Sequence, residues 1–186
     1  MHADRKKWND KYRRHGAITD PSHIVKTHFG LSRRGHALDI AAGTGRNAVF
    51  LAKHGFSVEA VDISDVGLGH LSGSELKITP ICADLDTFDI PPSRYDLVLN
   101  IRFCHRRLFP LIIEGLKIGG VLIFESYLED SDEKGQGPTC RDYLLRKNEL
   151  LHAFLDLHIL YYKEGTESGR KNLSRIASLV GVKKAD

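Results

Sequence analysis

The fold is decided by the stretch Leu38-Asp39-Ile40-Ala41-Ala42-Gly43-Thr44-Gly45, which is followed by Arg46-Asn47-Ala48-Val49-Phe50-Leu51-Ala52. The pattern predicts a short apolar strand, a glycine turn and the first turns of a helix. The two glycines allow a tight turn and let a ligand approach where a Cβ atom would collide. The predicted helix offers free N–H groups and a partial positive charge at its N-terminus, which suits an anionic or polar ligand.

The next predicted strand, residues 56–62, ends on an acid. Asp62 lies 17 positions after Gly45. A ribose-binding carboxylate is expected at this place in a strand-helix-strand nucleoside fold. The spacing therefore predicts a ligand that contains a nucleoside.

Two cofactors fit this skeleton, and Asp39 decides between them. Residues 43–48 read G-x-G-x-x-A, which is also a weak dinucleotide pattern. A carboxylate inside the strand would repel a pyrophosphate. S-adenosylmethionine has no phosphate, and its ammonium and sulfonium groups favour nearby negative charge. S-adenosylmethionine is therefore the predicted cofactor; the alternative is an ordinary strand-to-helix turn with a caged aspartate.

These residues resemble the first motif of the class I S-adenosylmethionine-dependent methyltransferases, D-x-G-x-G-x-G, with Ala41 at the first glycine position. Within the class, residues 39–48 are similar to the D-L-(G/A)-C-G-x-G-R-N-(S/A) pattern of tellurite-resistance-type methyltransferases, with Ala42 where cysteine is usual. Residues 8–12 are similar to their W-(D/N)-x-x-Y start. The resemblance covers essentially the whole chain and implies that Asp84, after the third strand, accepts from the adenine amino group. The alternative is that Asp84 only caps a loop. The predicted cofactor-binding residues are Asp39, Ala41, Gly43, Gly45, Asn47, Asp62, Ile63, Asp84, Leu85 and Asn100.

Composition bounds the class of protein. The chain has 186 residues, 41% hydrophobic and 27% charged, as expected for one globular domain with a sizeable core. No apolar run approaches the ~20 residues of a membrane span, and the first residues do not resemble a signal peptide. The cysteines, at 82, 104 and 140, are odd in number and widely spaced, which favours reduced thiols in a cytoplasm over a metal site or disulfides. The net charge of +3 neither requires nor excludes nucleic acid.

The fold class that we predict is α/β: a Rossmann-like, seven-stranded, mostly parallel sheet with helices on both faces and a C-terminal antiparallel hairpin. One domain spans 1–186, with an N-terminal helical lid over 1–30 and the core over 36–186. Glycines predict a short or distorted second core helix over 64–76, and residues 117–120 predict a turn. The last two strands are predicted over 157–164 and 174–182. A flexible loop is predicted over 128–141, with a hinge at Gly135 and Gly137.

Candidate catalytic and substrate residues lie at the predicted mouth of the sheet. His105 is the first candidate for a general base and Tyr127 the second; the alternative for His105 is an ordinary surface histidine. Trp8 and Tyr12 share one helix face and either close over the ligands or simply dock the helix on the core. Arg106 either clamps an acidic substrate or makes surface ion pairs. No metal site is expected.

The predicted function is in-line methyl transfer to a small-molecule acceptor through an O, N, S or chalcogen atom. Residues 100–103 lack the N-P-P-Y-like tetrapeptide that holds a flipped base, so a nucleic-acid substrate is not expected. One alternative is a non-catalytic relative that binds S-adenosylmethionine or a nucleoside. The other is an NAD-dependent oxidoreductase. The sequence indicates neither the acceptor nor the oligomeric state.

Overall fold

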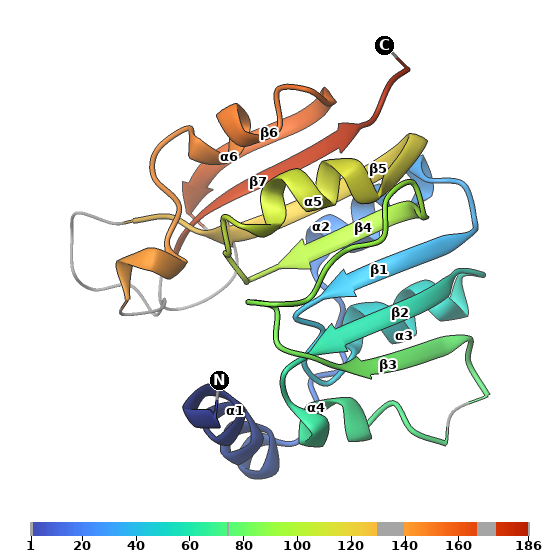
Figure 1. The fold of residues 1–186 in the computed structure, drawn as a ribbon, viewed down its shortest axis with the longest axis vertical. Coiled ribbons are helices and arrows are strands. Elements are labelled where there is room, and N and C mark those ends of the chain that lie inside the picture. Colours follow the sequence, from blue (N-terminus) through green and yellow to red (C-terminus); the bar gives the residue numbers. More distant parts are fainter. Residues whose placement is uncertain (1, 74, 130–139, 167–173, 186) are drawn as a thin grey trace.

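A seven-stranded sheet organises the molecule, as predicted (Figure 1). The structure shows its strand order, which is β3-β2-β1-β4-β5-β7-β6. The computed structural model describes residues 2–73, 75–129, 140–166 and 174–185. The strands are β1 (His36–Ile40), β2 (Ser57–Asp62), β3 (Ile78–Cys82), β4 (Tyr95–Ile101), β5 (Leu116–Tyr127), β6 (His158–Thr166) and β7 (Arg175–Val182).

The first five strands run parallel to one another, and β7 runs in the opposite direction between β5 and β6. β1 pairs with β2 and with β4, and β4 pairs with β5, all in parallel register. β7 then runs antiparallel to both β5 and β6, which confirms the predicted C-terminal pairing. Every residue of β4 is buried, as expected of an apolar strand covered on both faces.

Helices cover both faces of the sheet (Figure 1). They are α1 (His2–His15), α2 (His23–His28), α3 (Arg46–Lys53), α4 (Asp65–Gly69), α5 (Leu108–Gly115) and α6 (Glu149–Ala153), with 3-10 turns η1 (Phe29–Leu31) and η2 (Arg141–Tyr143). One core joins α5 and α6 to the sheet, and the other joins α2, α3 and α4 to the opposite face. Within the described residues, none of these helices is long and apolar enough to span a membrane.

The strand order reverses between β1 and β4, which lie side by side at the centre of the sheet. Crevices at such switch points, beyond the carboxyl ends of the strands, are where open α/β sheets bind ligands. Both strands are followed by a residue other than glycine in the left-handed region: Ala41 at φ 54° and Arg102 at φ 62°. Backbone strain of this kind concentrates at functional sites.

Two predicted segments differ from the structure or fall outside it. The turn expected over 117–120 is wrong, because β5 already begins at Leu116 and the backbone of 119 and 120 bonds to Lys183. The irregularity that the glycines signalled is a register shift against β4, between Tyr95 and Leu97. The second core helix, α4, is short, as expected. Most of the predicted 128–141 loop, residues 130–139, lies outside the described residues, as does the connection 167–173.

Candidate cofactor and active site

The glycine-rich turn after β1 adopts a backbone that glycine favours. Gly43 and Gly45 lie in the left-handed region, at φ 61° and 81°. The N–H of Gly45 donates to the carbonyl of Ala42 over 2.9 Å. A Cβ atom on Gly45 would lie 2.2 Å from a methyl carbon of Leu71. Conformation and space both require glycine here.

The Asp62 carboxylate ties the end of β2 to this turn. Its Oδ2 accepts from the N–H of Gly43 and its Oδ1 from the N–H of Ser64, both over 2.8 Å. Burial raises the pKa of Asp62, and the two N–H donors oppose that shift. Each carboxylate oxygen has a second lone pair, so the predicted role toward a ribose is chemically available and stays a prediction.

Asp39 is buried on the α3 side of β1, with 1% of its surface exposed. Burial raises its pKa to about 7, against the opposing effects of Arg46 and the backbone N–H of Ala48. Its Oδ2 has no hydrogen-bond partner among the described residues. A buried acceptor without a donor costs about 1–3 kcal/mol, so a cationic donor that reached Asp39 would be bound favourably.

Asp84 has a second acceptor of this kind, in the loop after β3. Its Oδ1 accepts from the N–H of Asp86 over 3.0 Å, and its carbonyl accepts from Phe88. The loop-capping role is therefore real. However, Oδ2 of Asp84 is buried and has no donor in the described part of the chain. The next residue, Leu85, packs into the α5 core.

Two buried carboxylate oxygens that receive no hydrogen bond within the described residues, Oδ2 of Asp39 and Oδ2 of Asp84, fit S-adenosylmethionine. We call them the donorless oxygens. Asp39 is the next-to-last residue of β1, and Asp84 lies in the loop after β3. Between these two strands in the sheet lies β2, which ends at Asp62. An ammonium suits the Asp39 carboxylate, and an adenine amino group suits Asp84. A pyrophosphate would bring only further acceptors to this edge. The donor and acceptor chemistry therefore favours a cationic nucleoside over a dinucleotide.

Three other residues in the predicted cofactor set already bond to the protein. Asn47 Oδ1 accepts from the backbone of Ser22 over 3.0 Å. The carbonyl of Ile63 accepts from Arg5 of α1, and the Asn100 amide donates to the carbonyl of Phe103 over 2.6 Å. These contacts attach the N-terminal segments and shape the turn after β4; any contact with the cofactor stays a prediction.

Helix α1 lies across the glycine turn, beside α4 (Figure 1). The Asn9 amide donates to Asp65 over 2.9 Å and accepts from Ser64 over 2.5 Å. A Cβ atom on Gly43 would lie 2.8 Å from the Tyr12 hydroxyl, so the phenol rests directly on the turn. Burial, and then the Asp62 carboxylate, raise the pKa of Tyr12. The Trp8 ring stacks on Tyr12 at 5.8 Å. The two aromatic rings thus lie on the side of α1 that faces the turn. This position fits both alternatives, docking of the helix on the core and covering of a bound ligand.

The predicted catalytic residues follow β4 and end β5. Nε2 of His105 lies 2.9 Å from Oδ1 of Asp86. Its other ring nitrogen, Nδ1, is buried and has no partner in the described residues. Tyr127 ends β5, with the Arg102 guanidinium 5.0 Å from its ring centroid. Arg102 also pairs with the buried Glu125 over 3.2 Å.

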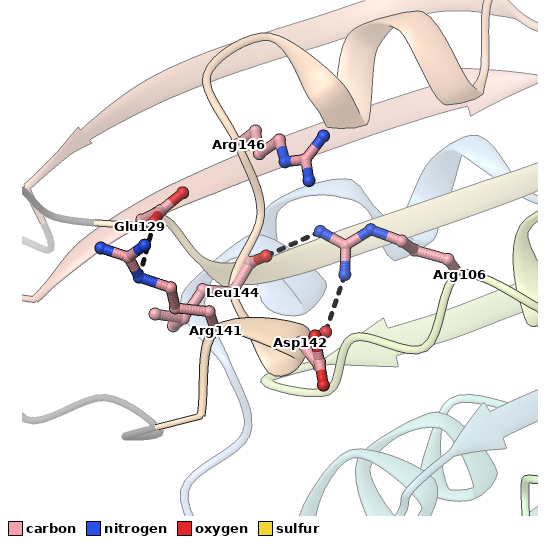
Figure 2. A pocket seen from close by; sticks show the side chains of 6 residues that line it. All are labelled: Arg106, Glu129, Arg141, Asp142, Leu144 and Arg146. Carbon is pink, nitrogen blue, oxygen red and sulfur yellow. Dashed lines mark hydrogen bonds and ion pairs between the residues drawn. The ribbon is translucent and has the colours of Figure 1, made fainter.

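Arg106 is used to hold the backbone in place. It makes a bidentate pair with Glu149, at 2.6 and 2.9 Å. It also donates to the carbonyls of Asp142 and Leu144 (Figure 2). Four hydrogen bonds thus engage this side chain, for which a substrate clamp and ion pairs were the two alternatives; a contact with substrate stays a prediction. The segment that carries η2 is fastened by this arginine to the turn after β4.

A pocket of about 370 Å³ lies beside this fastening. Figure 2 shows its lining, in which Arg141 pairs with Glu129 over 3.1 Å. The residues that line it are Arg106, Glu129, Arg141, Asp142, Leu144 and Arg146. None of them belongs to the glycine turn or the predicted cofactor set. This charged pocket therefore does not overlap the predicted cofactor residues.

Asp86 and Tyr143 are two residues of the site that sequence reasoning missed. Burial raises the pKa of Tyr143, and the carboxylates of Asp4 and Asp86 raise it further. The η2 turn, the start of α1 and the loop after β3 therefore converge near His105. The sequence carries a signal for Asp86 alone, which lies two positions after the predicted cofactor residue Asp84.

Comparison with known proteins identifies the fold and the domain. Residues 37–120 match a methyltransferase domain. The probable S-adenosyl-L-methionine-dependent methyltransferase TehB of Haemophilus influenzae is 23% identical to this chain over 188 residues, covering 91% of this chain and 62% of TehB. The chain thus spans less than two thirds of the length of that curated relative.

Solved structures of methyltransferases have the same fold as this chain. The crystal structure of TehB from Haemophilus influenzae aligns with a TM-score of 0.80 at 19% identity, covering 95% of this chain and 67% of TehB. The Burkholderia thailandensis 1,6-didemethyltoxoflavin-N1-methyltransferase, solved with 1,6-didemethyltoxoflavin and S-adenosylhomocysteine bound, aligns at 0.72 and 15% identity, covering 99% and 88%. These likenesses confirm the fold class.

The comparisons confirm the predicted resemblance. Residues 37–120 match a methyltransferase domain, and the chain resembles the S-adenosylmethionine-dependent methyltransferases of the TehB type.

Proposed function

We propose that this chain transfers a methyl group from S-adenosylmethionine to a small-molecule acceptor. The observation that supports it most is the pair of buried, donorless carboxylate oxygens on Asp39 and Asp84, which flank the glycine turn of a methyltransferase domain. They match the two donor groups, ammonium and adenine amino, at opposite ends of the cofactor. Asp62 then serves the ribose between them.

The chemistry divides between the cofactor and the chain. S-adenosylmethionine supplies an activated methyl on a sulfonium. The chain binds and orients the cofactor, aligns the acceptor and excludes water. Trp8 and Tyr12 on α1 belong to this proposal as a cover over the site, with residues 1–30 as the lid of a single domain. Both aromatics are partly buried and adjacent to the turn.

A small acceptor is favoured by what surrounds the mouth of the sheet. The α1 helix, the turn at His105 and the η2 turn approach one another there. The Burkholderia relative acts on a small heterocycle, according to its name, and no feature of this chain calls for a nucleic acid. The unpaired cysteines at 82, 104 and 140 support a cytoplasmic location.

Calorimetry tests the cofactor. S-adenosylhomocysteine and S-adenosylmethionine should bind and NAD should not. Asp62→Ala removes the charged acceptor of the ribose hydroxyls and should weaken binding by ~1.5–3 kcal/mol, or roughly tenfold to a hundredfold. Asp89→Ala, on the exposed loop before β4, is the control. NAD binding without S-adenosylmethionine binding would sink the proposal in favour of the oxidoreductase.

Turnover tests the enzyme against a non-catalytic relative. The protein is incubated with S-adenosylmethionine and panels of phenols, amines, thiols and heterocycles, and S-adenosylhomocysteine release is followed. Acceptor-dependent release supports the proposal. Tight cofactor binding with no release across the panels would identify a binding protein.

A further inference from the structure

The inference concerns the His105–Asp86 pair and rests on the proposed methyltransferase function. His105 lies in the turn after β4, at the switch point of the sheet, and Asp86 lies in the loop after β3. Nε2 of His105 is 2.9 Å from Oδ1 of Asp86. Because an ionised carboxylate can only accept, Nε2 carries the hydrogen of this bond.

The tautomer then follows for the other ring nitrogen. In a neutral imidazole with its hydrogen on Nε2, Nδ1 is a bare acceptor. Nδ1 is buried and has no donor among the residues that the structure describes. This nitrogen can therefore accept a hydrogen bond from a bound molecule. A carboxylate that holds the hydrogen on one ring nitrogen in this way prepares the other nitrogen to accept a proton.

The backbone of Asp86 is tied to one of the predicted cofactor residues. The N–H of Asp86 donates to Oδ1 of Asp84 over 3.0 Å, and Oδ2 of Asp84 is the acceptor assigned above to the adenine amino group. The Phe103 ring lies alongside the imidazole, with centroids 6.4 Å apart. The cofactor, the loop after β3 and the histidine are thus linked by successive contacts.

We infer that Asp86 is a positioning residue, that His105 is the general base, and that the acceptor is a hydroxyl or N–H compound that must lose a proton on methylation. The acceptor gives that proton to Nδ1 of His105 as its lone pair bonds to the methyl carbon. The electron pair of the broken carbon–sulfur bond stays on sulfur, whose positive charge is thereby neutralised. A thiol or chalcogen acceptor that is already ionised needs no such base.

The chain offers a matched control for Asp86. Asp89 lies on the same loop and pairs with Arg107, as Asp86 pairs with His105. Asp86→Asn and Asp89→Asn make the same chemical change three residues apart. Only the first removes the charge that fixes the imidazole.

The first experiment needs no turnover. Long-range proton–nitrogen correlation spectra are recorded on histidine-labelled protein saturated with S-adenosylhomocysteine, with His105 assigned by the signal lost in His105→Gln. We expect a neutral ring with its hydrogen on Nε2. In Asp86→Asn the two ring nitrogens should move toward each other as both tautomers are sampled, and in Asp89→Asn they should not. A wild-type ring protonated on Nδ1, or a spectrum unchanged in Asp86→Asn, overturns the inference.

The second experiment measures S-adenosylhomocysteine release with a series of para-substituted phenols and with thiols. His105→Gln should lower kcat for phenols at least a hundredfold and Asp86→Asn about tenfold, in line with the loss of general-base catalysis, while KM for S-adenosylmethionine stays within twofold. Turnover of thiols should change little. Equal losses for thiols and phenols, or equal effects of Asp86→Asn and Asp89→Asn, overturn the inference. Failure of wild-type protein to bind S-adenosylhomocysteine overturns the proposed function instead.

Discussion

At the turn after β1, the space around a glycine is as important as its backbone angle. Gly45 and Gly119 have nearly the same φ, 81° and 78°. A Cβ atom on Gly119 meets nothing within 4 Å, whereas one on Gly45 would collide with Leu71. Alanine substitutions at these two glycines therefore separate the free-energy cost of the left-handed backbone from the cost of crowding by Leu71.

Gly119→Ala should lower the free energy of unfolding by about 1–2 kcal/mol, the cost of a left-handed residue with a Cβ atom. Gly45→Ala should lose that amount and a further ~1–3 kcal/mol for overpacking against Leu71. Urea denaturation measures both. Equal losses would mean that Leu71 moves aside freely.

The raised pKa of Asp39 predicts how the stability of the folded protein depends on pH. The pKa of this carboxyl is about 7 in the folded chain and 3.8 in its ordinary state. Between these values the folded state holds the proton more tightly than the unfolded state. The free energy of unfolding of the ligand-free protein should therefore fall as pH rises from about 4 to 7.

Ligand binding should show the opposite dependence, because the ammonium of S-adenosylhomocysteine favours the ionised carboxylate. Its affinity should rise about tenfold between pH 6 and pH 8, with release of a proton. Calorimetry in two buffers of different ionisation enthalpy measures the release. Asp39→Asn should reduce the dependence, leaving the part due to Asp62, whose pKa is raised too. An affinity independent of pH in the wild type would contradict this account.

Sequence patterns predicted the glycine turn and the positions of the acids near the ends of the first three strands, because spacing along the chain specifies them. The bonds that Asn47 and Arg106 make within the protein were not predictable, because their partners, Ser22 and Glu149, lie 25 and 43 positions away. Nothing local indicates that such a side chain is already bonded.

Among the elements, α1 depends on a few polar contacts. Asn9 joins it to Ser64 and Asp65 around the start of α4, and Arg5 reaches the carbonyl of Ile63. Asn9 is the one residue of the described part of α1 that is fully buried. The helix should therefore open more easily than the core helices.

Asn9→Ala should weaken this docking by about 1–2 kcal/mol, so that amide exchange in α1 becomes roughly fivefold to thirtyfold faster while the sheet is unaffected. Asp10→Ala is the control, because its side chain pairs with Arg13 in the same helix. Hydrogen exchange followed by mass spectrometry measures both. Identical exchange in the two variants would mean that Trp8 and Tyr12, rather than Asn9, hold the helix.

The β5 strand shows why element boundaries are harder to predict than element identity. Its apolar half was predicted from the sequence, but residues 117–120 resembled a turn because they contain two glycines. In the structure the N–H of Gly119 donates to the carbonyl of Lys183 over 2.7 Å. That pairing, with a segment more than sixty residues away, extends the strand, and it cannot be inferred from the local pattern.

On the scale of the whole molecule, the sheet brings remote segments to one edge. The order β3-β2-β1-β4-β5-β7-β6 was predictable in kind, because buried parallel strands and a final polar hairpin leave distinct patterns. The convergence of α1 and η2 at that edge was predictable only as topology. The electrostatic effect of Asp4 and Asp86 on Tyr143 depends on the folded chain.

This convergence predicts a coupled response to the cofactor. S-adenosylhomocysteine should slow amide exchange in residues 2–15 and in residues 141–149 together, because both segments border the site and the Arg106–Glu149 pair fastens the second one to the turn that carries His105. Helix α2, which packs against β5, should not change. The Asp39→Asn protein, whose affinity is reduced, should show the change only at higher ligand concentration. If both segments exchange at the same rate with and without ligand, α1 is not a cover, and Trp8 and Tyr12 serve only to dock the helix on the core.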